Sequence, residues 1–268
     1  MPDLSAQLPS ALAKQARWVR LGPSEVPALV IHPDWEGGDP RPVMVWMHGR
    51  TVGKELDPGR YLRWMRSEGG GIATCAVDLP GHGERRAAGW EEPGRTLDVI
   101  EQMVGEIDGV VESLRRFGGL FDLTRVGIGG MSAGGIVALR RLCDPHGFSC
   151  ASVESTVGNV EFFFQREAVY PAAQIARVDP LRRVGQWRPV PLLAMHSRAD
   201  KVAPVAGIEG FIERLKGHYR AVGADEGLVE FRTWQETGAP FEHNGFGRHS
   251  AEAKSQQTAF LSRYLLGT

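Results

Sequence analysis

The chain has 268 residues, of which 42% are hydrophobic and 24% are charged, and its formal net charge at pH 7 is −1. This length fits one large α/β domain whose core buries most of its apolar surface. The near-neutral charge predicts no general attraction to nucleic acid or to anionic membranes. No apolar run in the sequence approaches the roughly 20 residues that a membrane-spanning helix needs.

The N-terminus and the cysteines favour a cytoplasmic location. Residues 1–5 lack the basic segment and the apolar segment of a secretory signal. The three cysteines, Cys75, Cys143 and Cys150, lie in apolar segments, and buried reduced thiols are typical of the cytoplasm. The eight histidines have no C-x-x-C or H-E-x-x-H companions, so we expect no metal site.

The first third of the chain predicts an antiparallel edge followed by buried strands. A short helix and an edge strand are expected within residues 5–22, and an antiparallel neighbour at 26–31. Residues 43–47 and 72–77 are apolar without alternation, as expected for strands buried on both faces of a sheet. A helix near 58–67 joins these two strands.

The rest of the chain alternates helices and strands. Apolar residues recur at helical spacing within 96–117, which predicts a helix covering one face of the sheet. Further strands are expected at 126–130, 148–153, 191–196 and 228–234, and further helices at 133–143, 205–221 and 250–266. This alternation implies a mostly parallel sheet with helices on both faces.

A nucleophile motif lies between the strand at 126–130 and the helix that follows it. Gly130-Met131-Ser132-Ala133-Gly134 matches G-x-S-x-G, in which a serine occupies a sharp strand-to-helix turn. The strand and the helix cross so closely there that the positions two before and two after the serine require glycine. The turn exposes the hydroxyl of Ser132 and aims the N–H of Ala133 at an oxyanion. A phosphate-binding turn or simple packing would give the same pattern, so the motif needs partners elsewhere.

Loops after two later strands offer these partners. A serine nucleophile requires a base and a carboxylate that orients the base. Asp200 follows the strand at 191–196, and both His243 and His249 follow the strand at 228–234. Glu154, just after the strand at 148–153, is a rival carboxylate. Ser, Asp, His is the chain order of the α/β-hydrolase triad.

Two arguments favour His243 over His249 as the base. His243 precedes a loop of several residues that lets its ring reach Ser132. His249 directly precedes the closing helix, and a helix N-terminus lowers the pKa of an imidazolium and weakens it as a proton acceptor.

The chain resembles an α/β-hydrolase of the small serine carboxylesterase and dienelactone-hydrolase-like branch. The resemblance runs from His48-Gly49 through the D-L-P-G-H-G loop at 78–83 and the Ser132 motif to the A-D-K-V-A-P segment at 199–204. The sequence E-H-N-G-F at 242–246 departs from the family's G-H-G-F, because Glu242 replaces a glycine and one residue is inserted. The resemblance implies that the backbone N–H of Arg50 is a second oxyanion donor and that His82 braces a loop.

The resemblance also implies one α/β-hydrolase domain over residues 1–268, with a small cap insertion at 156–187. Phe162 and Phe164 in that insertion either line a substrate pocket or pack the cap onto the sheet. The expected activity is hydrolysis of a small carboxylic ester by Ser132, His243 and Asp200, without a cofactor. A thioesterase, a C–C hydrolase, a peptidase or a non-catalytic ligand-binding relative remains an alternative. The expected partner is a small-molecule ester or acyl compound, and not a nucleic acid or a membrane.

Overall fold

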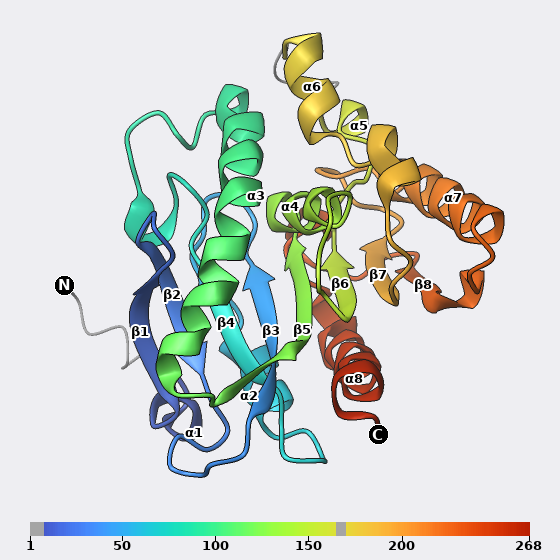
Figure 1. Cartoon of the computed structure of the whole chain (residues 1–268). Helices are drawn as coiled ribbons and strands as arrows, with labels where there is room; N and C mark the ends of the chain where they lie inside the picture. The colour runs from blue at the N-terminus through green and yellow to red at the C-terminus, as the bar shows by residue number, and fades with distance from the viewer. Residues whose placement is uncertain (1–7, 165–169) are drawn as a thin grey trace.

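A computed structural model of the chain describes residues 8–164 and 170–268, except for the side chains of residues 163 and 164. The described residues form one eight-stranded sheet with helices on both faces (Figure 1). The strands are β1 (Ala16–Leu21), β2 (Val26–Ile31), β3 (Arg41–Met47), β4 (Ala73–Val77), β5 (Phe121–Met131), β6 (Cys150–Glu154), β7 (Leu192–Ser197) and β8 (Val229–Trp234).

The strands are arranged in the order β1-β2-β4-β3-β5-β6-β7-β8. The pairs β1–β2 and β2–β4 are antiparallel, and every later pair is parallel. In the centre of the sheet Val45 of β3 is paired with Cys75 of β4 and with Ile128 of β5. The fold class predicted from the sequence, a mostly parallel sheet with an antiparallel edge, is confirmed.

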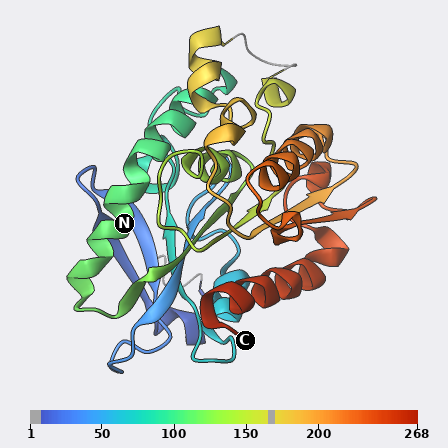
Figure 2. The ribbon, with the colours of Figure 1, turned by 45° about the vertical axis from the view of Figure 1, so that its right-hand side comes forward.

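Each face of the sheet has its own hydrophobic core. The helices are α1 (Ser10–Ala13), α2 (Pro58–Met65), α3 (Thr96–Glu112), α4 (Ala133–Arg141), α5 (Glu161–Phe164), α6 (Ala172–Val178), α7 (Ala206–Ala221) and α8 (Ser250–Leu261). Helices α3, α4 and α7 lie on one face of the sheet, and α2 and α8 lie on the other (Figure 2). Apolar side chains of α3, α4 and α7 form one core, and those of α1, α2 and α8 form the other. In α3 the buried residues Leu97, Ile100 and Ile107 recur at the predicted helical spacing.

Some predicted boundaries differ from the structure. Strand β5 begins at Phe121 rather than at residue 126, because Arg41 and Pro42 of β3 pair with Phe121 and Asp122 before the register shifts. The helix predicted at 250–266 is α-helical only to Leu261 and ends in a π-helical turn at Ser262–Leu266.

The segment 156–187 contains α5, α6 and a 3₁₀ turn at Leu181–Gln186, and its described residues include no strand. Helices α5 and α6 lie beyond the end of the sheet to which the parallel strands point (Figure 1). Trp187 is buried, and its Nε1–H donates to the hydroxyl of Tyr219 in α7 at 3.0 Å. This ring is therefore part of the core. Within the described part of the chain, the helices are too short or too polar to cross a membrane.

Candidate active site

Ser132 lies in the single-residue gap between the end of β5 at Met131 and the start of α4 at Ala133. Its backbone angles, φ 52° and ψ −119°, belong to a region that residues other than glycine rarely adopt. Two hydrogen bonds fix this conformation. The N–H of Ser132 donates to the carbonyl of Glu154 at 2.9 Å, and the hydroxyl of Thr156 donates to the carbonyl of Ser132 at 2.7 Å. The nucleophile turn predicted from the sequence is therefore present.

The glycines around Ser132 have the steric cause that the sequence predicts. A Cβ atom on Gly130 would lie 2.5 Å from the carbonyl carbon of Gly134 and 2.6 Å from the carbonyl oxygen of Met47. A Cβ atom on Gly134 would lie 2.4 Å from that same oxygen. These are backbone atoms that cannot move away, so strands β3 and β5 and helix α4 can meet only if both positions are glycine.

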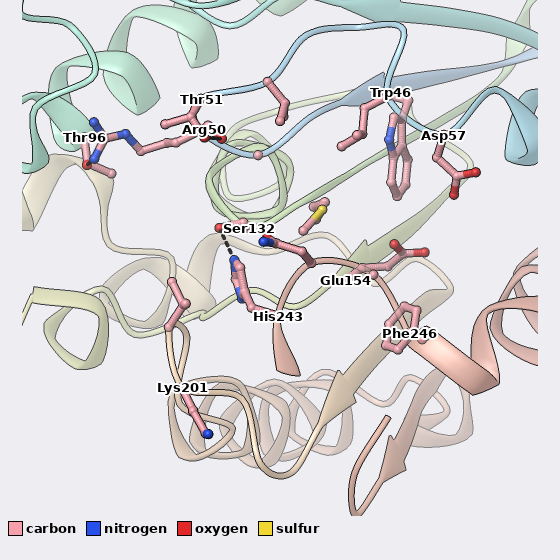
Figure 3. Close-up of a pocket in the computed structure, with 18 of the residues that line it drawn as sticks. Trp46, Arg50, Thr51, Asp57, Thr96, Ser132, Glu154, Lys201, His243 and Phe246 are labelled. Atoms are coloured by element: carbon pink, nitrogen blue, oxygen red, sulfur yellow. Dashed lines mark hydrogen bonds between the residues drawn. The ribbon is translucent and has the colours of Figure 1, made fainter. Parts of the chain in front are cut away.

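Ser132, His243 and Asp200 form a continuous hydrogen-bonded chain. His243 Nε2 lies 3.0 Å from Ser132 Oγ (Figure 3). His243 Nδ1 lies 2.8 Å from Asp200 Oδ2. All three side chains are largely buried. In this arrangement the serine hydroxyl donates to Nε2, while Nδ1–H donates to the carboxylate. The three residues follow β5, β8 and β7, so the parallel sheet itself brings them to one edge.

Asp200 is fixed by further donors. The N–H groups of Val202 and Ala203 donate to its Oδ1 at 2.8 and 2.7 Å, and His196 Nε2 lies 3.3 Å from its Oδ2. Burial acts to raise the pKa of Asp200, but hydrogen bonds from His196 and His243 outweigh burial and hold this pKa below its usual value. The carboxylate is therefore ionised at neutral pH and oriented toward His243.

The two rival residues lie in other environments. Glu154 is buried and its Oε2 accepts from Arg60 Nη2 at 2.8 Å, while its Oε1 accepts from Gln257 Nε2 at 3.1 Å. His249 is partly exposed, and its Nδ1 lies 3.1 Å from Glu252 Oε2. The structure thus places Glu154 in an ion pair with α2 and His249 beside the first turn of α8.

The loop after β3 runs directly beside the nucleophile. A Cβ atom on Gly49 would lie 3.3 Å from Ser132 Cβ, which is a tight contact, so the backbone of this loop passes close to the nucleophile. His48 holds this loop, because its Nδ1–H donates to the carbonyl of Gly49 at 2.5 Å and its Nε2 accepts from Leu79 N–H at 3.1 Å. The next residue is Arg50, which lines the same cavity as Ser132.

The side chain of Arg50 anchors this loop to the start of α3. Its guanidinium donates to Thr96 Oγ1 at 2.5 Å and to the carbonyl of Glu92 at 2.7 Å. On the other side of Ser132, Ala133 is the first residue of α4, so its N–H has no acceptor within the helix. Arg50, which the resemblance implies as the second oxyanion donor, thus lines the same cavity as Ser132, and Ala133 directly follows Ser132.

His82 is buried, and its ring nitrogen Nδ1 lies 2.7 Å from the carbonyl oxygen of Pro80 in its own loop. Burial lowers the pKa of its imidazole. The neighbouring Asp78 accepts from Lys54 Nζ at 2.9 Å and from Glu84 N–H at 2.9 Å. Asp78 therefore joins the segment around residue 54 to the loop at 78–84, whereas this contact of His82 lies within its own loop.

Glu242 is a site residue whose role sequence reasoning missed. Its carboxylate accepts from Ser197 Oγ at 2.7 Å, from Thr237 N–H at 2.6 Å and Oγ1 at 2.8 Å, and from Gly238 N–H at 2.7 Å. The hydrogen bond from Thr237 N–H, helped by the other donors, lowers the pKa of Glu242 to about 2. Its φ of 55° is positive, which explains why glycine suits this position. Glu242 therefore ties the His243 loop to the end of β7.

A cavity of about 1020 Å³ opens around Ser132 and His243. On one side it is lined by residues near α3 and the segment 156–187: Arg50, Thr51, Pro93, Thr96, Phe162 and Tyr170. On the other side it is lined by residues near α2 and α8: Trp46, Asp57, Arg60, Glu154, Phe246 and Lys254. Phe162 thus lies in the cavity wall, as one of the two alternatives predicts. The side chain of Phe164 lies outside the described part of the structure.

Comparison with protein families gives one match. Residues 44–253 match the model described as the alpha/beta hydrolase family. Among curated proteins, the chain is 29% identical over 199 residues to a putative esterase, YitV, from Bacillus subtilis (strain 168). That alignment covers 66% of this chain and 76% of the relative.

Solved structures show the same fold at low sequence identity. TT1662 from Thermus thermophilus has a TM-score of 0.70 and 23% identity, covering 93% of this chain and 98% of its own. The Pyrococcus furiosus esterase Pf2001 has a TM-score of 0.65 and 18% identity, with 93% of each chain covered. A puromycin-hydrolyzing peptidase from Mycobacterium tuberculosis has a TM-score of 0.72 and 19% identity. It matches 99% of this chain, but this chain spans only 41% of its length.

Proposed function

Because this chain belongs to the alpha/beta hydrolase family, we propose that it is a serine hydrolase that cleaves a small carboxylic ester through an acyl-enzyme. One observation carries the proposal. The Ser132 hydroxyl, the His243 ring and the Asp200 carboxylate are joined by hydrogen bonds of 3.0 and 2.8 Å beside a cavity large enough for a small molecule. This is the geometry that activates a serine hydroxyl as a nucleophile.

The proposed reaction has two halves. Ser132 Oγ attacks the acyl carbon as His243 Nε2 takes its proton, and the imidazolium then gives this proton to the departing alcohol. Water, deprotonated by His243, then attacks the acyl-enzyme and releases the acid and the free serine. Asp200, ionised and hydrogen-bonded to Nδ1–H, stabilises the imidazolium in both halves.

The backbone N–H groups of Ala133 and Arg50 are proposed to bind the oxyanion that forms in each half-reaction. Loss of one such donor typically costs on the order of 3 kcal/mol of transition-state stabilisation. The strained turn at Ser132 and the anchored side chain of Arg50 hold these groups in place before substrate arrives. Apart from the substrate and water, the proposed steps use only the chain's own residues and no cofactor.

The name of the Bacillus relative, a putative esterase, supports the choice of ester over other acyl substrates. Peptidase activity is the second candidate, because solved structures of the same fold include peptidases. Labelling by a fluorophosphonate tests for an activated serine. A panel of p-nitrophenyl esters, acyl-CoA thioesters and aminoacyl p-nitroanilides then separates esterase, thioesterase and peptidase activity. Absence of labelling would favour a non-catalytic binding protein.

We further propose that the chain acts in the cytoplasm as a single domain. Its three cysteines are buried and unpaired, which suits a reducing compartment. We propose that the segment 156–187 is a cap over the cavity, with Phe162 in the cavity wall.

The Asp200→Asn variant is expected to lose kcat on the order of 10³- to 10⁴-fold, because an amide no longer fixes the tautomer of His243. The Glu154→Gln variant should keep most of its kcat but lose roughly 3 kcal/mol of stability, because it removes one partner of the buried Arg60 ion pair. Steady-state kinetics and urea unfolding of both variants decide the assignment. A larger loss of kcat in Glu154→Gln than in Asp200→Asn would mean that Glu154 is the carboxylate of the triad.

Replacement of Glu242 by glutamine is expected to lower kcat roughly 10- to 100-fold with little change in KM, because His243 loses its fixed position. Glutamine places an NH₂ group, which is a donor, against the N–H donors of Thr237 and Gly238, so these hydrogen bonds are lost.

The pKa of Glu242 is lowered from 4.5 to about 2. The contribution of its carboxylate to stability is therefore complete above pH 4.5 and is lost as pH falls through about 2. Neutral pH thus suits the assay. Glu236→Gln, an exposed change in the same loop, is the control. A lower melting temperature with unchanged kcat would mean a purely structural role.

Phe162→Ala should change the preference for acyl chain length more than it changes stability, because the ring is only partly buried and lines the cavity. Each methylene that loses contact with the ring should lower kcat/KM by roughly threefold to fourfold, at about 0.8 kcal/mol per buried CH₂. The measurement is kcat/KM for p-nitrophenyl esters of increasing chain length, beside a thermal melt. Unchanged selectivity with a large drop in melting temperature would show that Phe162 is a core residue.

A further inference from the structure

The α2 and α8 side of the cavity carries charged side chains beside the nucleophile. Figure 3 shows Trp46, Asp57, Glu154 and Phe246 on one side of Ser132, with Arg50 and Thr96 on the opposite side. Nothing in the mechanism above requires charges here, so these side chains are left to contact a substrate.

The deeper charges satisfy one another. Arg60 donates to both carboxylate oxygens of Glu154, to Gln257 Oε1 at 2.8 Å and to Asp57 Oδ2 at 3.3 Å. Its guanidinium lies 4.4 Å from the ring centroid of Trp46. Arg60 and Glu154 are almost completely buried. This pair forms a fixed, buried floor, in which the Nη groups of Arg60 are hydrogen-bonded and its buried Nε has no partner among the described residues.

The outer pair, Asp57 and Lys254, keeps unused capacity. Lys254 Nζ donates to Asp57 Oδ1 at 2.6 Å, and the two side chains retain 20% and 28% of their exposure, respectively. Within the described residues this is the one hydrogen bond of the Lys254 ammonium, which has three N–H donors. Each oxygen of Asp57 accepts one hydrogen bond and has a lone pair left. A strong donor and a strong acceptor therefore lie side by side at the cavity wall.

Charge balance favours an uncharged ligand. Arg60 and Lys254 carry two positive charges, which Asp57 and Glu154 neutralise. A carboxylate or an ammonium placed beside them would add an unpaired charge to a partly desolvated site, which is unfavourable. Lys254 Nζ and Asp57 Oδ1 are only 2.6 Å apart. A ligand group that contacts both must therefore accept one hydrogen bond and donate another through nearly the same atom. A hydroxyl group does both through one oxygen.

We propose that Asp57 and Lys254 form a subsite for a hydroxyl group of the substrate, so that this side of the cavity selects hydroxylated acids or polyol esters over plain alkyl esters. The hydroxyl oxygen accepts from Lys254 Nζ, and its O–H donates to the Asp57 carboxylate. The rings of Trp46 and Phe246, which line the same side, contact the carbon skeleton. This proposal rests on the proposed esterase function and names its substrate class.

Two pairs of isosteric esters test the subsite, one for each half of the substrate. The acyl pair is p-nitrophenyl 3-hydroxybutyrate and p-nitrophenyl 3-methylbutyrate. The alcohol pair is glycerol 1-monobutyrate and 2-methylbutyl butyrate. In each pair the second ester has a methyl group in place of every hydroxyl group of the first, so the two esters have nearly the same size. The ratio of kcat/KM within a pair, compared between protein variants, removes differences in the intrinsic reactivity of the esters.

The Lys254→Met variant is expected to lower the hydroxyl-to-methyl ratio about tenfold in at least one pair, because it removes a charged donor from a polar group. Asp57→Asn is the second variant. Asparagine tolerates the left-handed backbone of residue 57 (φ 62°), so this variant keeps the test open if Lys254→Met folds poorly. Lys216→Met in α7, which is outside the cavity, is the matched control. Ratios that stay at the wild-type value in both pairs would overturn the subsite.

A binding measurement separates this proposal from the proposed function. If wild-type protein hydrolyses none of the four esters, the esterase proposal fails. Calorimetric titration of the Ser132→Ala variant with the alcohol pair then decides the subsite. Tighter binding of glycerol monobutyrate that is lost in the Ser132→Ala/Lys254→Met double variant supports the subsite, and equal affinity for both esters overturns it.

Discussion

Replacing Ser132 by alanine is expected to lower kcat for an activated ester by roughly 10⁴- to 10⁶-fold and to abolish labelling by a fluorophosphonate. The hydroxyl of Ser132 is the only group of this residue that the mechanism uses, and alanine keeps the Cβ atom that faces Gly49. The melting temperature should therefore change little. Kinetics with p-nitrophenyl butyrate, labelling and a thermal melt measure the three quantities on one preparation.

The control is Ser255→Ala, at an exposed serine of α8. It should keep both turnover and labelling. Turnover of Ser132→Ala at the wild-type rate would show that the serine mechanism is wrong. If turnover is lost and the melting temperature also falls sharply, fluorophosphonate labelling of the fraction that remains folded decides whether Ser132 is the nucleophile.

The second large effect is expected at His243. The variant His243→Ala should lose several orders of magnitude in kcat, since Ser132 Oγ then has no base within 3.0 Å. His249→Ala is the matched control from the same loop, because its ring pairs with Glu252 and lies partly exposed. Its kcat should remain near that of the wild type. The measurement is kcat for one activated ester at several pH values.

The opposite result, a large loss in His249→Ala only, would mean that the His243–Ser132 contact is not used in catalysis. A large loss in both variants would mean that the whole loop, rather than one ring, holds the base. The pH dependence distinguishes these cases, because removal of a general base also removes the inflection that this base gives to the kcat profile.

Much of the fold could be predicted because it depends on local patterns. Unbroken apolar runs such as 43–47 and 72–77 became the central parallel strands, and the antiparallel strand at 26–31, next to the edge strand, was also visible. The early start of β5 could not be predicted. Residues 121–122 pair with the first two residues of β3, and this pairing depends on a partner strand far away in the sequence. Local hydrophobicity carries no information about such a partner.

The part of the site around Ser132 could be predicted, because one short motif restricts the backbone geometry of the turn. The glycines around Ser132 are required by backbone atoms of β3 and α4, so the motif carries the turn with it. The ion pair of the rival carboxylate Glu154 could not be predicted from sequence, because its partner Arg60 is distant in the chain and only folding pairs them. The brace role of Glu242 was missed for the same reason, although its departure from the family's glycine was a visible signal.

The backbone of Ser132 sets folding stability against the proposed chemistry. A residue other than glycine in such a conformation costs on the order of 1–3 kcal/mol, and the hydrogen bonds of Ser132 with Glu154 and Thr156 offset this cost. Glycine would relieve the penalty without disturbing these hydrogen bonds. It would also remove the hydroxyl that the proposed mechanism uses. Stability and the proposed chemistry therefore make opposite demands on this one position, which is a trade-off between stability and activity.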